Sequence, residues 1–105
     1  MIKIIVVDDE QVIREGIVQI LEERLSDIAE IFSAEDGEVA YEIIVENSMD
    51  LVITDVNMPM LNGIDMMKAV SRSNRDCHVV VISGYKQFEF AREALKLGAI
   101  DYLLK

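Results

Sequence analysis

Short apolar runs alternate with longer amphipathic segments along the whole chain. The runs are rich in valine and isoleucine and too short for helices, which predicts buried strands. They lie at residues 2–7, 29–33, 51–54, 79–82 and 100–104. Between the runs, apolar residues recur at helical spacing, which is typical of amphipathic helices. These predicted helices centre on residues 12–24, 39–44, 64–70 and 88–95.

Five apolar strands separated by helix-length segments predict an α/β domain with a parallel sheet. Strands that are apolar on both faces suit a sheet covered by helices on both sides. The chain has 105 residues, so we expect one domain over residues 1–105.

Polar residues follow these strands where each one ends. Asp8 and Asp9 follow the first strand, and Asp55 ends the third. Ser83 ends the fourth strand and Lys105 follows the fifth. The carboxyl ends of parallel strands lie at one edge of the sheet, where ligands bind. We therefore expect three carboxylates, a hydroxyl and an ammonium to converge there.

This set of groups predicts phosphoryl chemistry. Three close carboxylates repel one another unless a cation joins them, and Mg²⁺ matches oxygen ligands. Asp55 stands alone at the end of a central strand and is the expected nucleophile, giving an aspartyl phosphate. Asp8 and Asp9 are the expected metal-holding pair. Lys105 and Ser83 would then bind phosphate oxygens. A single aspartate after a strand is often only a helix cap, so the joint pattern carries this prediction.

Charge and cysteine content narrow the possible partners and compartments. The formal net charge is −10, which speaks against direct nucleic acid binding by this chain. Cys77 is the single cysteine, which rules out an internal disulfide and fits a reducing, cytoplasmic compartment. No apolar run reaches the ~20 residues of a membrane-spanning helix.

The sequence resembles the receiver domain of a two-component response regulator. The motifs that carry the resemblance run in family order across nearly the whole chain: Val6 to Glu10, Asp36-Gly37, Asp55 to Pro59, Gly63, Ser83-Gly84, Ala94 to Ala99 and Asp101 to Lys105. The resemblance implies a flavodoxin-like, doubly wound sheet with strand order 2-1-3-4-5. It also implies that Asp55 accepts a phosphoryl group from a phosphohistidine of a sensor histidine kinase. Such a domain is not a conventional enzyme, but it catalyses its own phosphorylation and dephosphorylation.

The resemblance further implies roles for individual residues. Asp9, Asp55 and the main-chain carbonyl of Asn57 would ligate Mg²⁺, with Asp8 acting nearby through water. Ser83 and Tyr102 occupy the family's switch positions, so phosphorylation would change the surface of the fourth helix and fifth strand. That surface is a candidate homodimer contact and would control an output, which we expect to be transcription.

A finer likeness points to receivers fused to AraC-type helix-turn-helix output domains. It rests on Ser83-Gly84-Tyr85, Phe88 to Ala91 and Ala94 to Gly98. Binding to DNA would then belong to sequence outside this chain. The family normally continues past the lysine with a proline and a fifth helix, so we expect the domain to be truncated at its C-terminal end. Apolar surface left exposed there would favour self-association.

Three other functions fit parts of the pattern. A haloacid-dehalogenase-type phosphatase also uses an aspartate nucleophile after a strand, but it usually has a second acid where this chain has Asn57. A nucleotide-binding domain would need a glycine-rich first turn. A receiver-like interaction module that takes no phosphate is the third alternative. The presence of Asp8, Asp9, Asp55, Ser83 and Lys105 argues against it.

Overall fold

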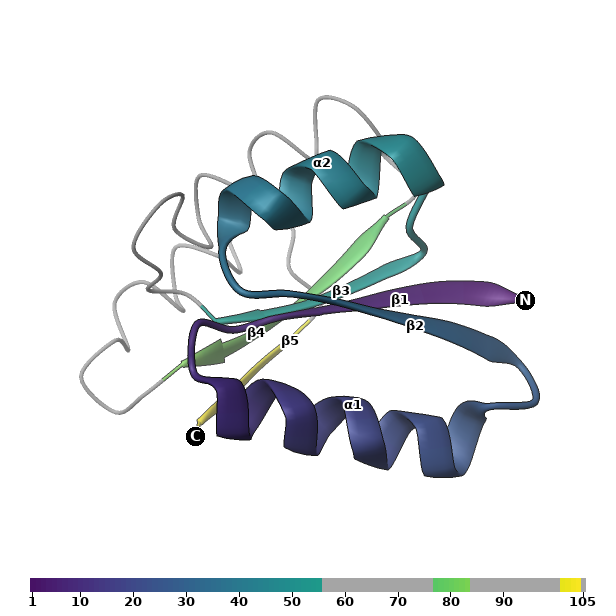
Figure 1. Cartoon of the computed structure of the whole chain (residues 1–105), viewed down its shortest axis with the longest axis horizontal. Coiled ribbons are helices and arrows are strands. Elements are labelled where there is room, and N and C mark those ends of the chain that lie inside the picture. The colour runs from purple at the N-terminus through teal and green to yellow at the C-terminus, as the bar shows by residue number, and fades with distance from the viewer. Residues whose placement is uncertain (56–76, 84–100, 105) are drawn as a thin grey trace.

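The computed structural model describes residues 1–55, 77–83 and 101–104 (Figure 1). For Ser83 and residues 101–104 the description covers the backbone. The helices predicted around residues 64–70 and 88–95 lie outside the described residues, as do Asn57 and Lys105.

Seven elements follow one another in the described part of the chain. They are β1 (Ile2–Val7), α1 (Gln11–Leu25), β2 (Ala29–Ala34), α2 (Gly37–Asn47), β3 (Leu51–Asp55), β4 (His78–Ser83) and β5 (Asp101–Leu104). All five predicted strands and the first two predicted helices are confirmed. β3 and β4 extend beyond their apolar runs, because Asp55 pairs with Ile82 and His78 with Leu51. Backbone pairing sets a strand's length, so polar residues can lie within it.

The five strands form one parallel sheet in the order β2-β1-β3-β4-β5. This order confirms the predicted flavodoxin-like arrangement. The chain leaves β1 for the edge strand β2 and then returns to the other side of β1 as β3. The direction of winding therefore reverses between β1 and β3, and this reversal is where such sheets bind ligands.

Helices cover the sheet on both faces, with α2 on one side and α1 on the other (Figure 1). Alternate residues of a strand point to opposite faces, so the apolar strands serve two layers of packing. Ile5 and Val7 belong to the core cluster that also holds Ala40 and Ile44 of α2. Ile4 and Val6, on the opposite face, are also fully buried. The two-sided covering that the uniformly apolar strands predicted is therefore present.

Asp36 and Ser48 mark the two ends of α2. The Asp36 carboxylate accepts a hydrogen bond from the Val39 amide at 2.8 Å, which satisfies an amide that the helix itself leaves without a partner. Ser48 adopts a left-handed conformation with a φ of 54°, and its amide donates to the Ile44 carbonyl. Both ends fix the length of α2 and present Ala40 and Ile44 to the sheet.

The packing of α2 predicts a strong contrast between two neighbouring residues. Ile44 is 1% exposed and Val45 is 50% exposed. Replacing Ile44 by alanine leaves a cavity between α2 and the sheet, and we expect a loss of about 2–4 kcal/mol in the free energy of unfolding. The control, Val45→Ala, should cost less than about 0.5 kcal/mol. Urea denaturation followed by circular dichroism measures both, and equal losses would contradict this assignment of the core.

Candidate functional site

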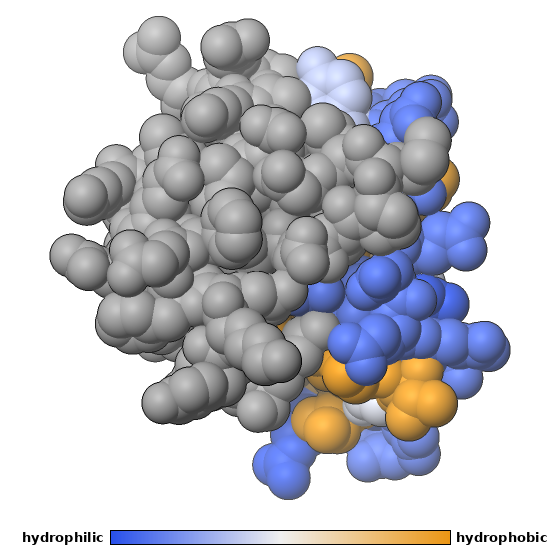
Figure 2. All heavy atoms as spheres, turned by 90° about the vertical axis from the view of Figure 1, so that its left-hand side faces the viewer, coloured by the Kyte–Doolittle hydropathy of each residue, from blue (hydrophilic) through white to orange (hydrophobic). Residues whose placement is uncertain are grey.

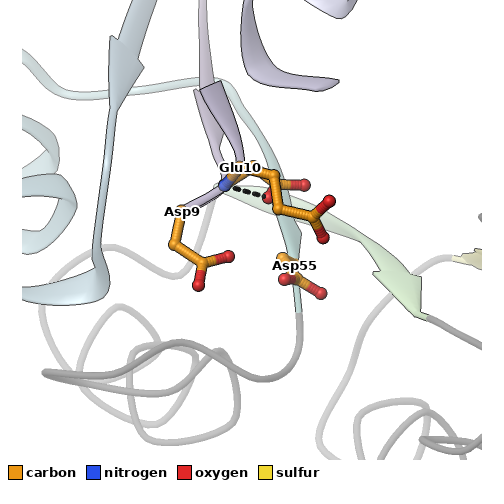
Figure 3. A group of neighbouring side chains, drawn as sticks. Asp9, Glu10 and Asp55 are labelled. Carbon is orange, nitrogen blue, oxygen red and sulfur yellow. Dashed lines mark hydrogen bonds between the residues drawn. The ribbon is translucent and has the colours of Figure 1, made fainter. Parts of the chain in front are cut away.

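Four carboxylates meet where β1 and β3 end. One carboxylate oxygen from each of Asp8, Asp9, Glu10 and Asp55 lies within 4.8 Å of the others. The side chains of Asp9, Glu10 and Asp55 lie close together at this edge in Figure 3. Asp8 and Asp55 are buried, with 1% and 2% of their surface exposed, whereas Asp9 and Glu10 reach solvent. We name these four residues the acidic cluster.

The register of the sheet brings the two buried acids together. Val7 pairs with Thr54 across β1 and β3, so the residues that follow them, Asp8 and Asp55, are neighbours at the sheet edge. Thr54 is fully buried, and its hydroxyl donates to the Asp55 carbonyl at 2.9 Å. Asp55 therefore ends a strand that is paired on both sides and held by its neighbour.

Hydrogen bonds hold the segment that connects β1 to α1. The Asp8 amide continues the pairing with β2 by donating to the Ala34 carbonyl at 3.2 Å. The Asp8 carboxylate accepts from the Glu10 amide at 2.9 Å, drawn as the dashed line in Figure 3. The Arg14 guanidinium donates to the Asp8 carbonyl, also at 2.9 Å. Asp9 thus lies between Asp8 and Glu10, two residues that hydrogen bonds hold in place.

The acidic cluster has the chemistry of a site for a hard divalent cation. Carboxylates this close repel one another in their charged forms, and a bound cation converts that repulsion into attraction. The donors are all carboxylate oxygens, which Mg²⁺ and Ca²⁺ prefer over nitrogen or sulfur. The exposed side chains of Asp9 and Glu10 leave a route by which an ion could enter from solvent.

The predicted site residues fall into three groups. The structure brings together Asp8, Asp9 and Asp55, as the sequence predicted for the strand ends. It places Ser83 at the last position of β4 and Tyr102 within β5. Asn57 and Lys105 lie outside the described residues. The chemical roles of all seven stay predictions.

Sequence reasoning assigned no role to Glu10 or Arg14. Glu10 lies next to the predicted metal pair, so its place in the acidic cluster could have been anticipated from adjacency. Arg14 is six residues after Asp8, and its contact depends on where α1 begins. A helix that starts at Gln11 turns Arg14 back toward the strand end, and no motif announces that start.

Figure 2 presents the side of the molecule toward which the strands run to their carboxyl ends. Hydrophilic side chains cover much of the coloured surface there, and apolar ones gather below them, where α1 lies. Val12 and Ile20 of α1 are 85% and 55% exposed. They are separated by two helical turns, so they lie on one side of α1. Val12, two residues after Glu10, therefore adds exposed apolar surface close to the acidic cluster.

A family model, that of the response regulator receiver domain, matches residues 4–105. The chain belongs to the response regulator receiver domain family. This confirms the resemblance that the motifs carried. As a receiver domain of a two-component response regulator, it has its acidic cluster at the sheet edge where the order of strands reverses.

The relatives of this receiver domain include transcriptional regulatory proteins. It is 37% identical to HptR of Staphylococcus aureus over 105 residues, which is all of this chain and 41% of that protein. It is 41% identical to YesN of Bacillus subtilis over 105 residues, again all of this chain but 28% of that protein. The receiver domain thus spans less than half the length of these curated relatives.

Solved structures show the same fold. The receiver domain of AraT, a response regulator from Geobacillus stearothermophilus, superposes with a TM-score of 0.89 at 38% identity, covering 98% of this chain and 80% of that one. The receiver domain of NtrX from Brucella abortus gives a TM-score of 0.87 at 31% identity, covering 97% and 84%. In the described part of this receiver domain, neither helix has the length and apolar character needed to cross a bilayer.

Cys77 directly precedes β4, at the amino end of the strands and away from the acidic cluster. Burial of the thiol, with the charge of Asp50 as a lesser cause, raises its pKa to about 11. We expect alkylation by iodoacetamide at pH 8 to be far slower in the folded protein than in urea, because the thiolate is the nucleophile. The rate should rise about tenfold per pH unit up to the pKa. Equal rates in folded and unfolded protein, followed by mass spectrometry, would contradict the raised pKa.

Proposed function

We propose that this receiver domain accepts a phosphoryl group onto Asp55 from the phosphohistidine of a sensor histidine kinase, with Mg²⁺. The acidic cluster is the observation that carries the proposal, because it joins a buried carboxylate at a strand end to three further carboxylates. The family to which the chain belongs supports the same reaction.

The transfer needs one nucleophile and one leaving group. A carboxylate oxygen of Asp55 attacks phosphorus, forming the P–O bond of an acyl phosphate while the P–N bond of the phosphohistidine breaks. The imidazole nitrogen keeps the electron pair of the broken bond and takes up a proton. Hydrolysis reverses the modification: water attacks phosphorus and the Asp55 carboxylate leaves. Asp55 suits the role of nucleophile because its main chain is held by pairing with Ile82 and by the Thr54 hydroxyl.

Asp8, Asp9 and Asp55 would hold the cation. Mg²⁺, when bound, offsets the negative charge of the phosphoryl oxygens that approach a carboxylate-rich site. The main-chain carbonyl of Asn57 is proposed as a further ligand, and Lys105 and Ser83 as donors to phosphate oxygens. These three residues extend the cluster on the strength of the family motifs in the sequence.

The exposed apolar residues of α1 support docking of another protein beside the site. Val12 and Ile20 of α1 offer exposed apolar contact area. We propose that a kinase that presents its phosphohistidine to Asp55 also covers this region. Burial of such side chains is the main favourable contribution to association.

Phosphorylation would move the switch residues Ser83 and Tyr102 and thereby change the surface of the fourth helix and fifth strand. We propose that this surface forms a homodimer contact and controls transcription through an output domain, in line with the regulatory relatives. An AraC-type helix-turn-helix domain is the proposed output. With a net charge of −10, the receiver domain itself is unsuited to bind DNA.

Phosphorylation of Asp55 is testable with a small acyl phosphate. Incubation with acetyl phosphate and Mg²⁺ should add one phosphoryl group to the wild type, seen by intact-mass spectrometry, and none to Asp55→Asn. The control Asp27→Asn, an exposed aspartate between α1 and β2, should be modified like the wild type. Absence of an adduct in the wild type would favour the phosphorylation-independent interaction module.

Binding of Mg²⁺ should stabilise the fold, since the assembled carboxylates exist only in the native state. At about ten times its dissociation constant, the ion should add about 1.4 kcal/mol to the free energy of unfolding. The melting temperature should rise by several degrees, and the rise should disappear in Asp9→Asn. Sodium chloride at matched ionic strength is the control. A melting temperature that is indifferent to millimolar Mg²⁺ would contradict the proposed metal site.

A further inference from the structure

Arg14 contacts the segment that carries the acidic cluster at two points. Its main-chain amide donates to the Glu10 carbonyl at 2.9 Å, the first hydrogen bond of α1. Its guanidinium donates to the Asp8 carbonyl at 2.9 Å. The contact is half-buried, so the bond is partly shielded from competing water. Arg14 thus donates to the main-chain carbonyls of the two residues that flank Asp9 in the connection between β1 and α1.

The hydrogen bond from the Arg14 guanidinium holds a segment in which repulsion between neighbouring carboxylates opposes the native arrangement. Three of the four acids of the cluster are consecutive, Asp8 to Glu10, and the fourth lies across the sheet at Asp55. Their mutual repulsion favours any movement that carries the connecting segment away from β3. Two further bonds hold Asp8: its amide donates to the Ala34 carbonyl, and its carboxylate accepts from the Glu10 amide. The guanidinium joins Asp8 to the helix.

We propose that Arg14 is a positioning residue for the cation site: its guanidinium holds the Asp8 main chain so that the carboxylates of the cluster stay assembled before the metal arrives. The identity of the cation as Mg²⁺ rests on the proposed function. The holding of the segment rests on the hydrogen bonds alone.

A positioning role and a purely electrostatic role have opposite consequences. If Arg14 acted only through its positive charge, its removal would strengthen Mg²⁺ binding, because one competing cation would be lost. If it acts through the hydrogen bond, its removal weakens binding, because the ion must then also order the segment. The donor reaches a main-chain carbonyl of the metal-holding segment, so the geometry favours the second role.

Two matched variants separate these roles. In Arg14→Gln the side chain is shorter and uncharged, and we expect the dissociation constant for Mg²⁺, measured by titration calorimetry, to rise about tenfold. Arg24→Gln removes the same charge from the last turn of the same helix and should leave the constant unchanged. Arg14→Lys keeps a donor and the charge, and should recover most of the lost affinity.

A second measurement tests, without metal or phosphate, whether Arg14 holds the segment. The Glu10 amide donates to the Asp8 carboxylate, so its hydrogen exchange reports whether the segment is held. In the metal-free protein, Arg14→Gln should speed exchange at Glu10, with no change at the amides of Ile5 and Val52 in the core. Arg24→Gln should leave all three unchanged.

The outcomes distinguish this inference from the proposed function. Unchanged or tighter Mg²⁺ binding by Arg14→Gln, or unchanged exchange at Glu10, would overturn the role of Arg14 and leave phosphorylation of Asp55 intact. Failure of the wild type to bind Mg²⁺ would overturn the proposed metal site, and exchange at Glu10 would still decide whether Arg14 holds the segment.

Discussion

The pairing of β1 with β3 is the constraint on which the acidic cluster depends. Ile5 pairs with Val52, and both are fully buried. A shift by one residue would exchange these side chains with those that pack on the opposite face, so close packing on both faces holds the register. That register makes Asp8 and Asp55 neighbours. The hydrophobic effect therefore supplies the free energy that keeps carboxylates together against their own repulsion.

Two connections from a strand to a helix show why only some aspartates enter the cluster. Asp8 follows β1 and Asp36 follows β2, and the carboxylate of each accepts a hydrogen bond from a nearby amide. Asp36 caps α2 and lies outside the acidic cluster, because β2 is the edge strand and β1 separates it from β3. Asp8 follows a central strand, so its carboxylate also lies close to that of Asp55 at the end of β3. Position in the sheet, rather than residue type, separates a cap from a candidate ligand.

The sequence predicted the strands well because their apolar runs record burial on both faces. It also predicted that Asp8, Asp9 and Asp55 converge, since parallel strands share one edge. It missed the start of β4, where the polar residue His78 joins the sheet through its backbone pairing with Leu51. The hydrogen bond from Arg14 to the Asp8 carbonyl could not be predicted from the sequence either. A bond from a side chain to a main-chain carbonyl six residues earlier has no compositional signature and exists only once the helix start is known.

Hydrogen bonds at the amino end of the sheet also hold β1 and β3 in register. There the Lys3 amide donates to the Asp50 carboxylate at 2.8 Å, and the Asp50 amide donates to the Lys3 carbonyl at 2.9 Å. The Lys3 ammonium also donates to the Asn47 carbonyl at 3.0 Å, which ties the end of α2 to β1. The bonds between Lys3 and Asp50 join β1 to the residue that precedes β3, on the amino-terminal side of the buried part of both strands. A register fixed at the amino end is carried along paired strands to the carboxyl end. The closeness of Asp8 and Asp55 therefore depends on these contacts as well as on the buried side chains between the two ends of the sheet, although no carboxylate of the cluster takes part in them.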